Sequence, residues 1–328
     1  MMIRLLRVIG QNRLKNIVIE NLKMKKLCYL IIGVMISLNS CDTTEPELFD
    51  YHNKILFTSS RSGKEQLYMM NPDGTNIVQI TSGEYWHNNG RWSPDAQRIV
   101  CNTEEGTTTA GIEMVVFNSD GSNRILLGWG NQMSWSPDGK QIAFIYLPMP
   151  ELGLRFRFIY IINTDGSGGR QITSDSLEII SSLCWSNEGN KIYFVSNRYD
   201  VTNHNGSELY YMNNDGTDLT RLTYTLDGKS YSPSISSSNS KIVFMSTMNG
   251  AAKGSIYICD IDGGNIILLV TPPEIEIYNF PRWSSDEQYI IFTGILANGT
   301  ETSIYKIEVN GNNLTKLADN ASNPDWGK

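Results

Sequence analysis

The 328-residue sequence has few histidines, few cysteines and, beyond its first 40 residues, few basic side chains. Three His and five Cys leave little material for metal sites or acid–base catalysis. Residues 1–40 hold seven of the 27 Lys and Arg but only one of the 34 Asp and Glu, so the 20 basic and 33 acidic residues that remain give a net charge of −13. A surface this acidic repels phosphate backbones and anionic headgroups, which argues against nucleic-acid and membrane-surface binding.

The apolar stretch near the N-terminus is short. It covers residues 27–38, follows a Met-Lys-Lys sequence that begins at Met24, and precedes an Asn-Ser-Cys sequence that ends at Cys41. A basic region, a short apolar core and small residues in this order are typical of a secretory signal, and the apolar core is too short to span a bilayer. We therefore expect a signal region over residues 1–40 with its functional start at Met24.

The residues that end this stretch carry a second signal. Leu-Asn-Ser-Cys, ending at Cys41, resembles the lipobox of bacterial lipoproteins, in which the Cys is diacylated and becomes the new N-terminus. The resemblance implies a lipidated tether over residues 41–53, anchored to the outer membrane of a Gram-negative bacterium on its periplasmic side or at the cell surface. An ordinary signal peptide without lipid is the alternative.

Cysteine usage agrees with such a location. Cys28 would leave with the signal and Cys41 would carry lipid, so Cys101, Cys184 and Cys259 remain in apolar, strand-like segments. We expect three buried free thiols, since Cys is among the residue types most often buried. A disulfide between two of them stays open.

A tryptophan motif, Trp-Ser-Pro-Asp in its full form, recurs along the chain at intervals of 43–50 residues. A short apolar segment follows each internal copy. We expect the anchor side chains to pack between neighbouring sheets as large apolar groups, not to bind a cofactor. The anchors are Trp92, Trp135, Trp185, the weaker Ile235, Trp283 and the C-terminal Trp326.

Asp-Gly and Asn-Gly pairs recur in register with the tryptophan anchors. They lie at Asp73-Gly74, Asp120-Gly121, Asp165-Gly166, Asp215-Gly216, Asp262-Gly263 and Asn310-Gly311. Such pairs supply the positive φ angles that tight hairpins need, so each marks a turn between two strands. The segments between turns show no helical periodicity, and each unit therefore holds four antiparallel strands.

Four strands in each unit of 43–50 residues are the signature of a β-propeller. The repeats begin at Lys54 with what matches the second strand of a unit, and they end around Trp326 with what matches a first strand. The sequence therefore predicts an all-β fold, a six-bladed β-propeller over residues 54–328, closed by the C-terminal strand pairing into the first blade. Closure of this kind removes exposed sheet edges.

The best copy of the unit resembles a known family. From Trp135 to Thr173 it reads Trp-Ser-Pro-Asp-Gly-Lys-Gln-Ile-Ala-Phe and then Asp-Gly followed by Ile-Thr, which is similar to the WD40-like repeats of TolB-like periplasmic propellers. The resemblance covers residues 54–328 and implies a six-bladed ring at the cell envelope. TolB itself binds the peptidoglycan-associated lipoprotein and carries an α/β domain ahead of its propeller. Between Cys41 and Lys54 we expect no such domain.

Aromatic residues outside the repeat suggest a binding surface on the connections between blades. Trp86 and Trp129 each lie six residues before an anchor, so we expect them at equivalent places near the channel mouth. Such residues anchor protein partners or stack on sugars. The alternative is that they plug the channel and fill gaps between sheets. The candidate surface comprises Tyr85, Trp86, His87, Trp129, Tyr231, Tyr278 and Phe280.

Catalytic signals are weak. His87 and His204 lie in different units, and the sequence shows neither a His-x-x-x-His spacing nor the Gly-x-Ser-x-Gly elbow that prolyl oligopeptidase-type enzymes need in a further domain. The sequence thus predicts a monomeric, non-catalytic module that binds an envelope protein or a glycan, with no catalytic residue, metal or cofactor. The alternative is a glycan-active enzyme at the channel mouth, similar to the metal-dependent propeller lyases that act on pectin fragments.

Overall fold

The structure is a computed structural model that describes residues 50–105, 112–146, 157–173, 180–197, 206–224, 228–248, 254–269, 275–296 and 301–327. The chain divides into two units, Met1–Asp50 and Tyr51–Lys328, and every strand described below belongs to the second. The predicted signal region, the start at Met24 and the lipidation site Cys41 lie outside the described residues. None of the described residues belongs to a helix long and apolar enough to cross a membrane.

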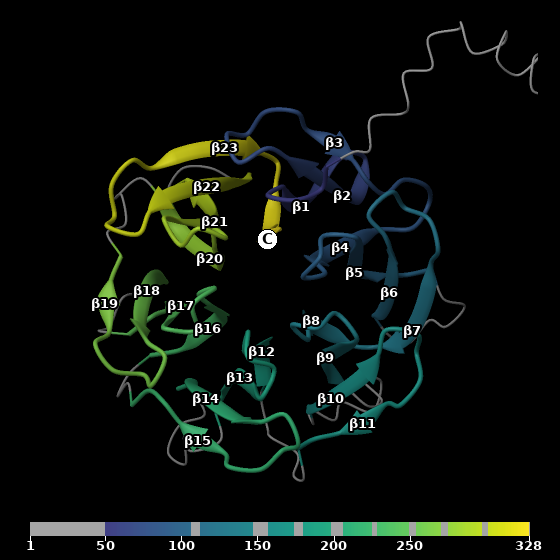
Figure 1. Cartoon of the computed structure of the whole chain (residues 1–328). Coiled ribbons are helices and arrows are strands. Elements are labelled where there is room, and N and C mark those ends of the chain that lie inside the picture. Colours follow the sequence, from purple (N-terminus) through teal and green to yellow (C-terminus); the bar gives the residue numbers. More distant parts are fainter. Residues whose placement is uncertain are drawn as a thin grey trace, which may run out of the picture. The chain divides into compact units, whose positions relative to one another are not determined.

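The described strands form six antiparallel four-stranded sheets, blades 1 to 6, arranged as a ring with the first strand of each blade nearest the centre (Figure 1). Blade 1 consists of β24 (Ser322–Trp326), β1 (Ile55–Ser62), β2 (Lys64–Met70) and β3 (Val78–Gln79). Blade 2 consists of β4 (His87–Trp92), β5 (Arg98–Thr103), β6 (Glu113–Asn118) and β7 (Ile125–Trp129). Blade 3 consists of β8 (Asn131–Trp135), β9 (Gln141–Tyr146), β10 (Phe158–Asn163) and β11 (Arg170–Gln171).

The other three blades repeat the same meander. Blade 4 consists of β12 (Ile180–Trp185), β13 (Lys191–Ser196), β14 (Glu208–Asn213) and β15 (Thr220–Arg221). Blade 5 consists of β16 (Ser230–Ile235), β17 (Lys241–Ser246), β18 (Ser255–Asp260) and β19 (Ile267–Leu268). Blade 6 consists of β20 (Ile275–Trp283), β21 (Tyr289–Leu296), β22 (Thr302–Glu308) and β23 (Thr315–Asp319). The predicted six-bladed all-β propeller is confirmed.

The C-terminal strand closes the ring. β24 pairs antiparallel with β1, with Ile55 opposite Trp326. The backbone N–H of Gly327 donates to the Lys54 carbonyl at 2.9 Å, and the Trp326 indole N–H donates to Asn53 Oδ1 at 2.7 Å. Blade 1 is therefore built from both ends of the propeller, as the ends of the repeats predict.

In blades 2, 3 and 6, the Ser-x-Asp part of the tryptophan motif stabilises the turn that follows the anchor. In blade 3, Ser136 Oγ donates to Asp138 Oδ1 at 2.6 Å and accepts the backbone N–H of Gln141 at 2.9 Å. Gly139 completes the turn with φ of 67°. The side chains thus satisfy backbone groups that a tight turn leaves without partners in the sheet.

The Asp-Gly turns have the positive φ that the sequence predicts. In blade 4, Gly216 has φ of 92°, and Asp215 Oδ1 accepts hydrogen bonds from the backbone and hydroxyl of Thr217 at 3.0 and 2.7 Å. A Cβ on Gly216 would lie 2.0 Å from the carbonyl oxygen of Ile172 in the neighbouring blade. Conformation and space both require glycine at this turn.

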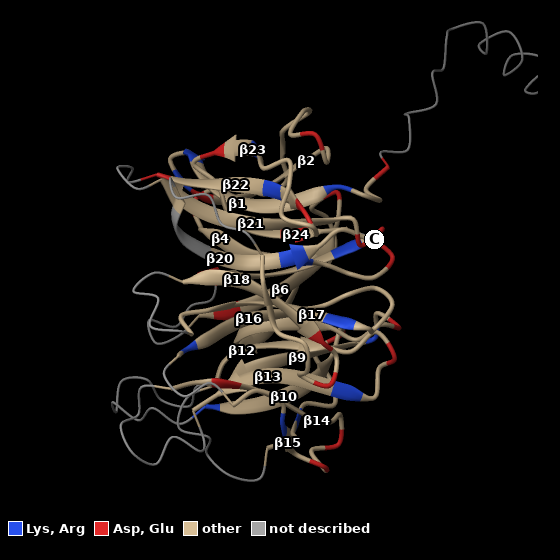
Figure 2. Cartoon of the chain, turned by 90° about the vertical axis from the view of Figure 1, so that its left-hand side faces the viewer, with Lys and Arg blue, Asp and Glu red and all other residues tan. Residues whose placement is uncertain are grey.

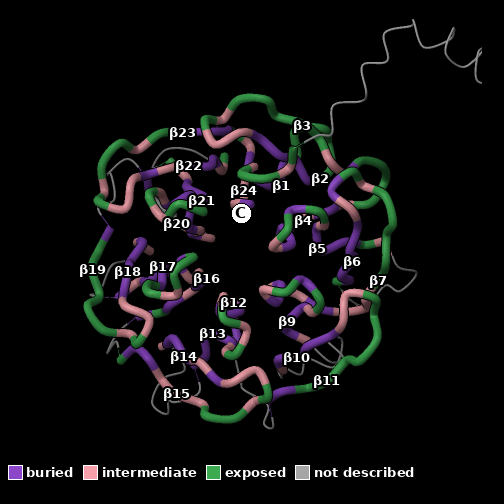
Figure 3. Tube along the Cα trace, viewed as in Figure 1, coloured by how far each residue is buried: buried purple, intermediate pink, exposed green. Residues whose placement is uncertain are grey.

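Among the residues that the structure describes, the hydrophobic core forms six clusters, one in each interface between neighbouring blades. Trp92 packs with strands of blades 1 and 2, Trp135 with blades 2 and 3, and Trp185 with blades 3 and 4. Burying these large side chains ties each sheet to the next. Figure 3 shows the buried residues along the inner and middle strands, whereas the short outer strands β3, β11 and β19 are exposed.

The innermost strands share an irregularity near the channel. Three residues before the anchor, five of the six blades have a residue other than glycine with positive φ, and these residues are Asn89, Gln132, Ser232, Phe280 and Asn323. The pairing register of these strands shifts at or next to this position. Bulges of this kind bend a strand and redirect its side chains, and here they do so around the axis of the ring.

Candidate functional site

The predicted aromatic residues lie at different positions along the strands of the ring. Tyr85, 46% exposed, and the half-buried Trp86 directly precede β4. Tyr231 and Phe280 are half-buried within β16 and β20, four and three residues before their anchors. Tyr85 and Trp86 therefore mark the end of the ring where the innermost strands begin, and Tyr231 and Phe280 lie further inside it.

Trp129 and Trp86 both lie just before an innermost strand, but only Trp129 belongs to a strand itself. Trp129 ends β7, the outermost strand of blade 2, opposite Glu113 of β6, and lies two residues before β8, whereas Trp86 directly precedes β4. Only Gly130 separates β7 from β8, so strand pairing continues almost to the next blade and leaves no loop there. Tyr278 belongs to β20, but its side chain is outside the described residues.

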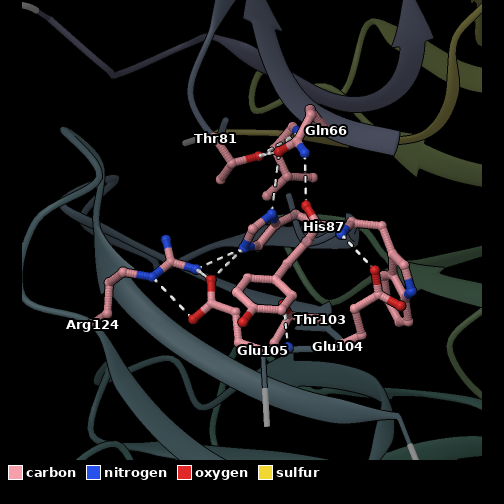
Figure 4. Close-up of polar contacts among 10 residues, drawn as sticks. Gln66, Thr81, His87, Thr103, Glu104, Glu105 and Arg124 are labelled. Carbon is pink, nitrogen blue, oxygen red and sulfur yellow. Dashed lines mark hydrogen bonds and ion pairs between the residues drawn. The ribbon is translucent and has the colours of Figure 1, made fainter. Parts of the chain in front are cut away.

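His87 is the centre of a buried polar network at this end of the ring (Figure 4). It begins β4, and its side chain is 2% exposed. Nδ1 lies 3.2 Å from Gln66 Oε1, and Nε2 lies 2.8 Å from Glu105 Oε1 and 2.6 Å from Arg124 Nη2. Arg124 and Glu105 also form an ion pair with each other. We call these four residues the His87 network.

The protonation of His87 follows from its neighbours. Gln66 Oε1 already accepts a hydrogen bond from Thr81 Oγ1 at 2.7 Å, so the same oxygen accepts the Nδ1–H of His87. Burial is the main cause that lowers the pKa of His87, and Arg124 lowers it further, whereas Glu105 raises it. A ring that carries its single proton on Nδ1 would accept a hydrogen bond from Arg124 at Nε2, whereas a protonated ring would donate from Nε2 to Glu105.

The same network holds the aromatic segment in place. Gln66 Nε2 donates to the carbonyl of Tyr85 at 2.7 Å, and Lys64 Nζ donates to the carbonyl of Glu84. Strand β2 of blade 1 therefore fixes the chain just before Trp86, and His87 fixes it just after. A surface segment tied on both sides is ordered before any ligand arrives.

Sequence reasoning found His87 but missed Gln66, Glu105 and Arg124. Glu105 follows β5 and Arg124 precedes β7, 18 and 37 residues from His87 in sequence. These residues belong to no motif, so only the pairing of the strands brings them together.

The residues present at this end do not form a metal-binding set. Among the described residues, no group of three or more His, Cys, Asp or Glu side chains is placed to hold a metal ion. The two ring nitrogens of His87 already face Gln66, Glu105 and Arg124. His204 lies outside the described residues, and His52 is exposed at the start of the described chain.

Comparison with known families identifies the repeats. The family model described as "TolB beta propeller domain" matches residues 128–328, which is more than half of the chain. The chain belongs to the TolB β-propeller family. The blade packing and closing strand described above are thus the framework of a TolB-like propeller.

Solved structures share the TolB-like ring. TolB from Acinetobacter baumannii is 19% identical, with a TM-score of 0.69 over 85% of this chain and 67% of that one. The putative TolB from Agrobacterium tumefaciens is also 19% identical, with a TM-score of 0.61 over 83% and 90%. Oligogalacturonate lyase from Vibrio parahaemolyticus is 12% identical, with a TM-score of 0.56 over 81% and 74%. These likenesses show the fold.

A curated relative adds a partial match. An uncharacterized protein of Agrobacterium fabrum is 28% identical over 112 residues, which is 29% of this chain and 37% of the relative. The TolB-like chain thus spans little more than a third of that relative's length. The three described cysteines of the present chain are free, so no disulfide joins them. Cys101 and Cys259 are buried as predicted, whereas Cys184 is half-buried.

Proposed function

We propose that this TolB-like propeller is a non-catalytic module that binds a protein partner at the envelope of a Gram-negative bacterium. The single observation that carries the proposal is the segment Tyr85–Trp86, which presents two aromatic side chains on a backbone held from both sides. Pre-ordered aromatic side chains contribute most of the energy at many protein interfaces because they bury large areas at little conformational cost. Membership of the TolB family supports a protein partner over a glycan.

The proposed binding surface comprises Tyr85 and Trp86 at the rim, with Trp129, Tyr231 and Phe280 as further contributors. Tyr85 is exposed, whereas the other four are half-buried. A partner that covered the rim would remove Tyr85 and the outer part of Trp86 from water and leave the blades unchanged. Rigid docking of this kind is the ordinary case for pre-organised surfaces.

An acyl anchor on Cys41 would keep the propeller at a membrane, joined to it at the Trp92 end and not at the Tyr85–Trp86 end. The chain between Cys41 and the first propeller contact is short, since the Tyr51 ring already lies 6.1 Å from that of Trp92. About nine residues, each spanning at most about 3.5 Å, place the ring within about 30 Å of the lipid. We therefore expect the partner to be an envelope protein close to the same membrane.

The test is site-specific crosslinking in cells that make the protein. A photo-reactive amino acid replaces Tyr85 at the rim or, as a matched control, Ile267, which is 56% exposed on the outer strand β19. We expect one discrete, mass-spectrometrically identified adduct from position 85 and none from position 267. Equal adducts from both positions, or none from either, would contradict the proposed surface.

A double substitution separates binding from architecture. Trp86→Ala combined with Trp129→Ala should abolish the adduct while the melting temperature stays within about 3 °C of wild type, because both side chains are only half-buried. A drop of about 10 °C or more would instead show that the two tryptophans fill gaps between the sheets. Capture that persists in a stable double variant would place the partner elsewhere.

A glycan-active enzyme is the second candidate, favoured by the likeness to oligogalacturonate lyases, one of them in complex with manganese. The described residues supply no three-ligand metal set at the channel, so we assign them no metal-dependent step. Incubation of the protein with oligogalacturonate and Mn²⁺, followed at the absorbance of unsaturated products, tests this alternative directly. Turnover that His87→Gln removes would replace the binding proposal.

A further inference from the structure

The opposite end of the channel contains a second site that the aromatic surface does not touch. A cavity of about 160 Å³ lies there, lined by all six repeat anchors and by the residue immediately before each of them. These preceding residues occupy equivalent positions around the ring. In blade order they are Asp325, Arg91, Ser134, Cys184, Ser234 and Arg282.

Charge is distributed unevenly around these six positions. Blade 1 lies between blades 6 and 2, so Arg282, Asp325 and Arg91 come from three consecutive blades. Arg282 Nε lies 3.6 Å from Asp325 Oδ1. The other three positions hold two hydroxyls and a thiol. Two guanidinium groups and one carboxylate leave this side of the cavity with one net positive charge.

One carboxylate oxygen of Asp325 accepts a backbone hydrogen bond, which leaves less of its charge to compensate the two arginines. Its Oδ2 accepts the backbone N–H of Trp92 at 2.8 Å, which joins blade 1 to blade 2. In blade 3 a neutral side chain performs the same task, because Ser134 Oγ accepts the backbone N–H of Trp185 at 3.0 Å. The tie between blades therefore needs an acceptor at this position, but it needs neither a charge nor an arginine.

The arginines make no such tie to the next blade. Arg91 donates to the carbonyl of Gly90 at 2.7 Å and to Asn89 Oδ1 at 2.9 Å, both neutral acceptors on its own strand. Arg282 donates to the carbonyl of its neighbour Pro281 at 2.9 Å. Within the described chain, Arg91 has no carboxylate at ion-pair distance. Desolvation and the nearby Arg282 lower the pKa of Arg91 to about 9 although Asp325 acts in the opposite direction, so Arg91 still carries its charge at neutral pH.

Two buried guanidinium groups that share one carboxylate keep one positive charge unbalanced, which is costly, and a second carboxylate satisfies it best because the planar guanidinium matches carboxylate oxygens in two parallel hydrogen bonds. We propose that Arg91 and Arg282 bind a carboxylate group of a peptide segment that enters the channel at the end formed by the Trp-Ser turns. The choice of a peptide over a uronate sugar rests on the proposed function as a protein-binding module. The excess charge of the site itself requires only an anion.

The surroundings favour one narrow anionic group over a broad acidic surface. Apolar side chains of the anchors flank the two arginines, so a ligand that reaches them leaves water. Outside the cavity, Figure 2 shows acidic and basic residues together at the strand ends, where the C-terminus also lies. Since the chain beyond residue 40 has a net charge of −13, long-range attraction does not bring an anion here, and the local pair of guanidinium groups must hold it.

The test measures binding of small carboxylate probes through the tryptophans that line the cavity. The probes are acetyl-Gly-Gly-Asp-amide, its neutral counterpart acetyl-Gly-Gly-Asn-amide, acetyl-triglycine with a free C-terminus, and digalacturonate. We expect saturable changes of tryptophan fluorescence with at least one peptide carboxylate and none with the neutral peptide. Binding should weaken as salt rises.

Substitutions of opposite sign separate binding from folding. Arg91→Met and Arg282→Met should each weaken the peptide carboxylate by about tenfold or more, because each removes a charge-assisted pair of hydrogen bonds. Asp325→Asn keeps an acceptor for Trp92 but removes the competing charge, so it should strengthen binding by about threefold or more. The matched control is Arg170→Met on the exposed outer strand β11, which should change nothing.

Several outcomes would overturn the inference. Affinity that is equal in wild type and Arg91→Met would refute a role of that guanidinium, and weaker binding by Asp325→Asn would show that the charge balance is not what holds the anion. Binding of digalacturonate without any peptide carboxylate would assign the site to uronate sugars. No binding by any probe at millimolar concentration would refute the site.

Binding of carboxylate probes in the channel is tested independently of the aromatic surface. If crosslinking at Tyr85 fails while the peptide carboxylates bind, the proposed docking surface is wrong and the channel site stands. If crosslinking succeeds and no carboxylate binds, the reverse holds. Arg91→Met should leave the Tyr85 adduct unchanged, since the two residues lie towards opposite ends of β4.

Discussion

Removing the Trp326 side chain tests whether ring closure stabilises the propeller. The half-buried indole packs against the cluster between blades 6 and 1, its ring lies 6.5 Å from that of Tyr289, and its N–H donates to Asn53 at 2.7 Å. Truncating a partly buried aromatic residue costs about 2 kcal/mol, and the lost hydrogen bond about 1 kcal/mol. Trp326→Ala should therefore lower the free energy of unfolding by about 3 kcal/mol.

The assay is denaturant and thermal unfolding of the purified protein. A loss of about 3 kcal/mol corresponds to a melting temperature about 6–10 °C lower in a chain of this size. Trp86→Ala is the matched control, since Trp86 is half-buried as well but precedes β4 and joins no closing strand. It should cost less than about 1 kcal/mol. Equal losses in the two variants would contradict the special role of β24.

Deleting the closing strand β24 should destabilise the propeller more than Trp326→Ala does. Without residues 321–328, strand β1 becomes an exposed edge that other chains can pair with. We expect the truncated protein to associate at micromolar concentration and to regain monomeric, cooperative unfolding when a synthetic peptide of residues 321–328 is added. A truncated protein that stays monomeric with wild-type stability would refute the reasoning.

Three further predictions follow from single contacts. Burial holds the pKa of His87 below its ordinary value of 6.5, so the unfolded chain takes up the proton first as the pH falls. The stability that neutral His87 contributes is therefore full above about pH 6.5 and lost as the pH falls towards the pKa of the folded state. Between pH 7.5 and 5, the free energy of unfolding should fall less steeply in His87→Gln than in wild type. Ser136→Ala should cost about 1 kcal/mol because Gln141 N–H and Asp138 lose their partner, whereas exposed Ser122→Ala should cost less by equilibrium denaturation. Burial raises the pKa of the Cys259 thiol to about 12, so maleimide should label it only after unfolding, and labelling of the native protein would contradict its burial.

Local features explain how far the sequence could be interpreted. Asp-Gly pairs and the Ser-x-Asp turns act through residues no more than five apart, as at Asp215 and Ser136, so their spacing alone predicts hairpins, four-stranded units and six blades. Closure was predictable too, because a unit that lacks its first strand at Lys54 must find it at Trp326. The pairing of Trp129 within β7 was not predictable, since the length of β7 depends on pairing with β6 rather than on distance from an anchor.

The two candidate sites depend on contacts that no short pattern contains. His87 meets Glu105 and Arg124 only because the folding of blade 2 brings together the start of β4, the residues after β5 and the residue before β7. Arg282 meets Asp325 only because ring closure adds the C-terminal strand β24 to blade 1, next to blade 6. Sequence by itself determined the repeating architecture, because turns and alternating strands are local; tertiary structure alone decided which charges share the channel, because that depends on how distant blades are placed around the axis.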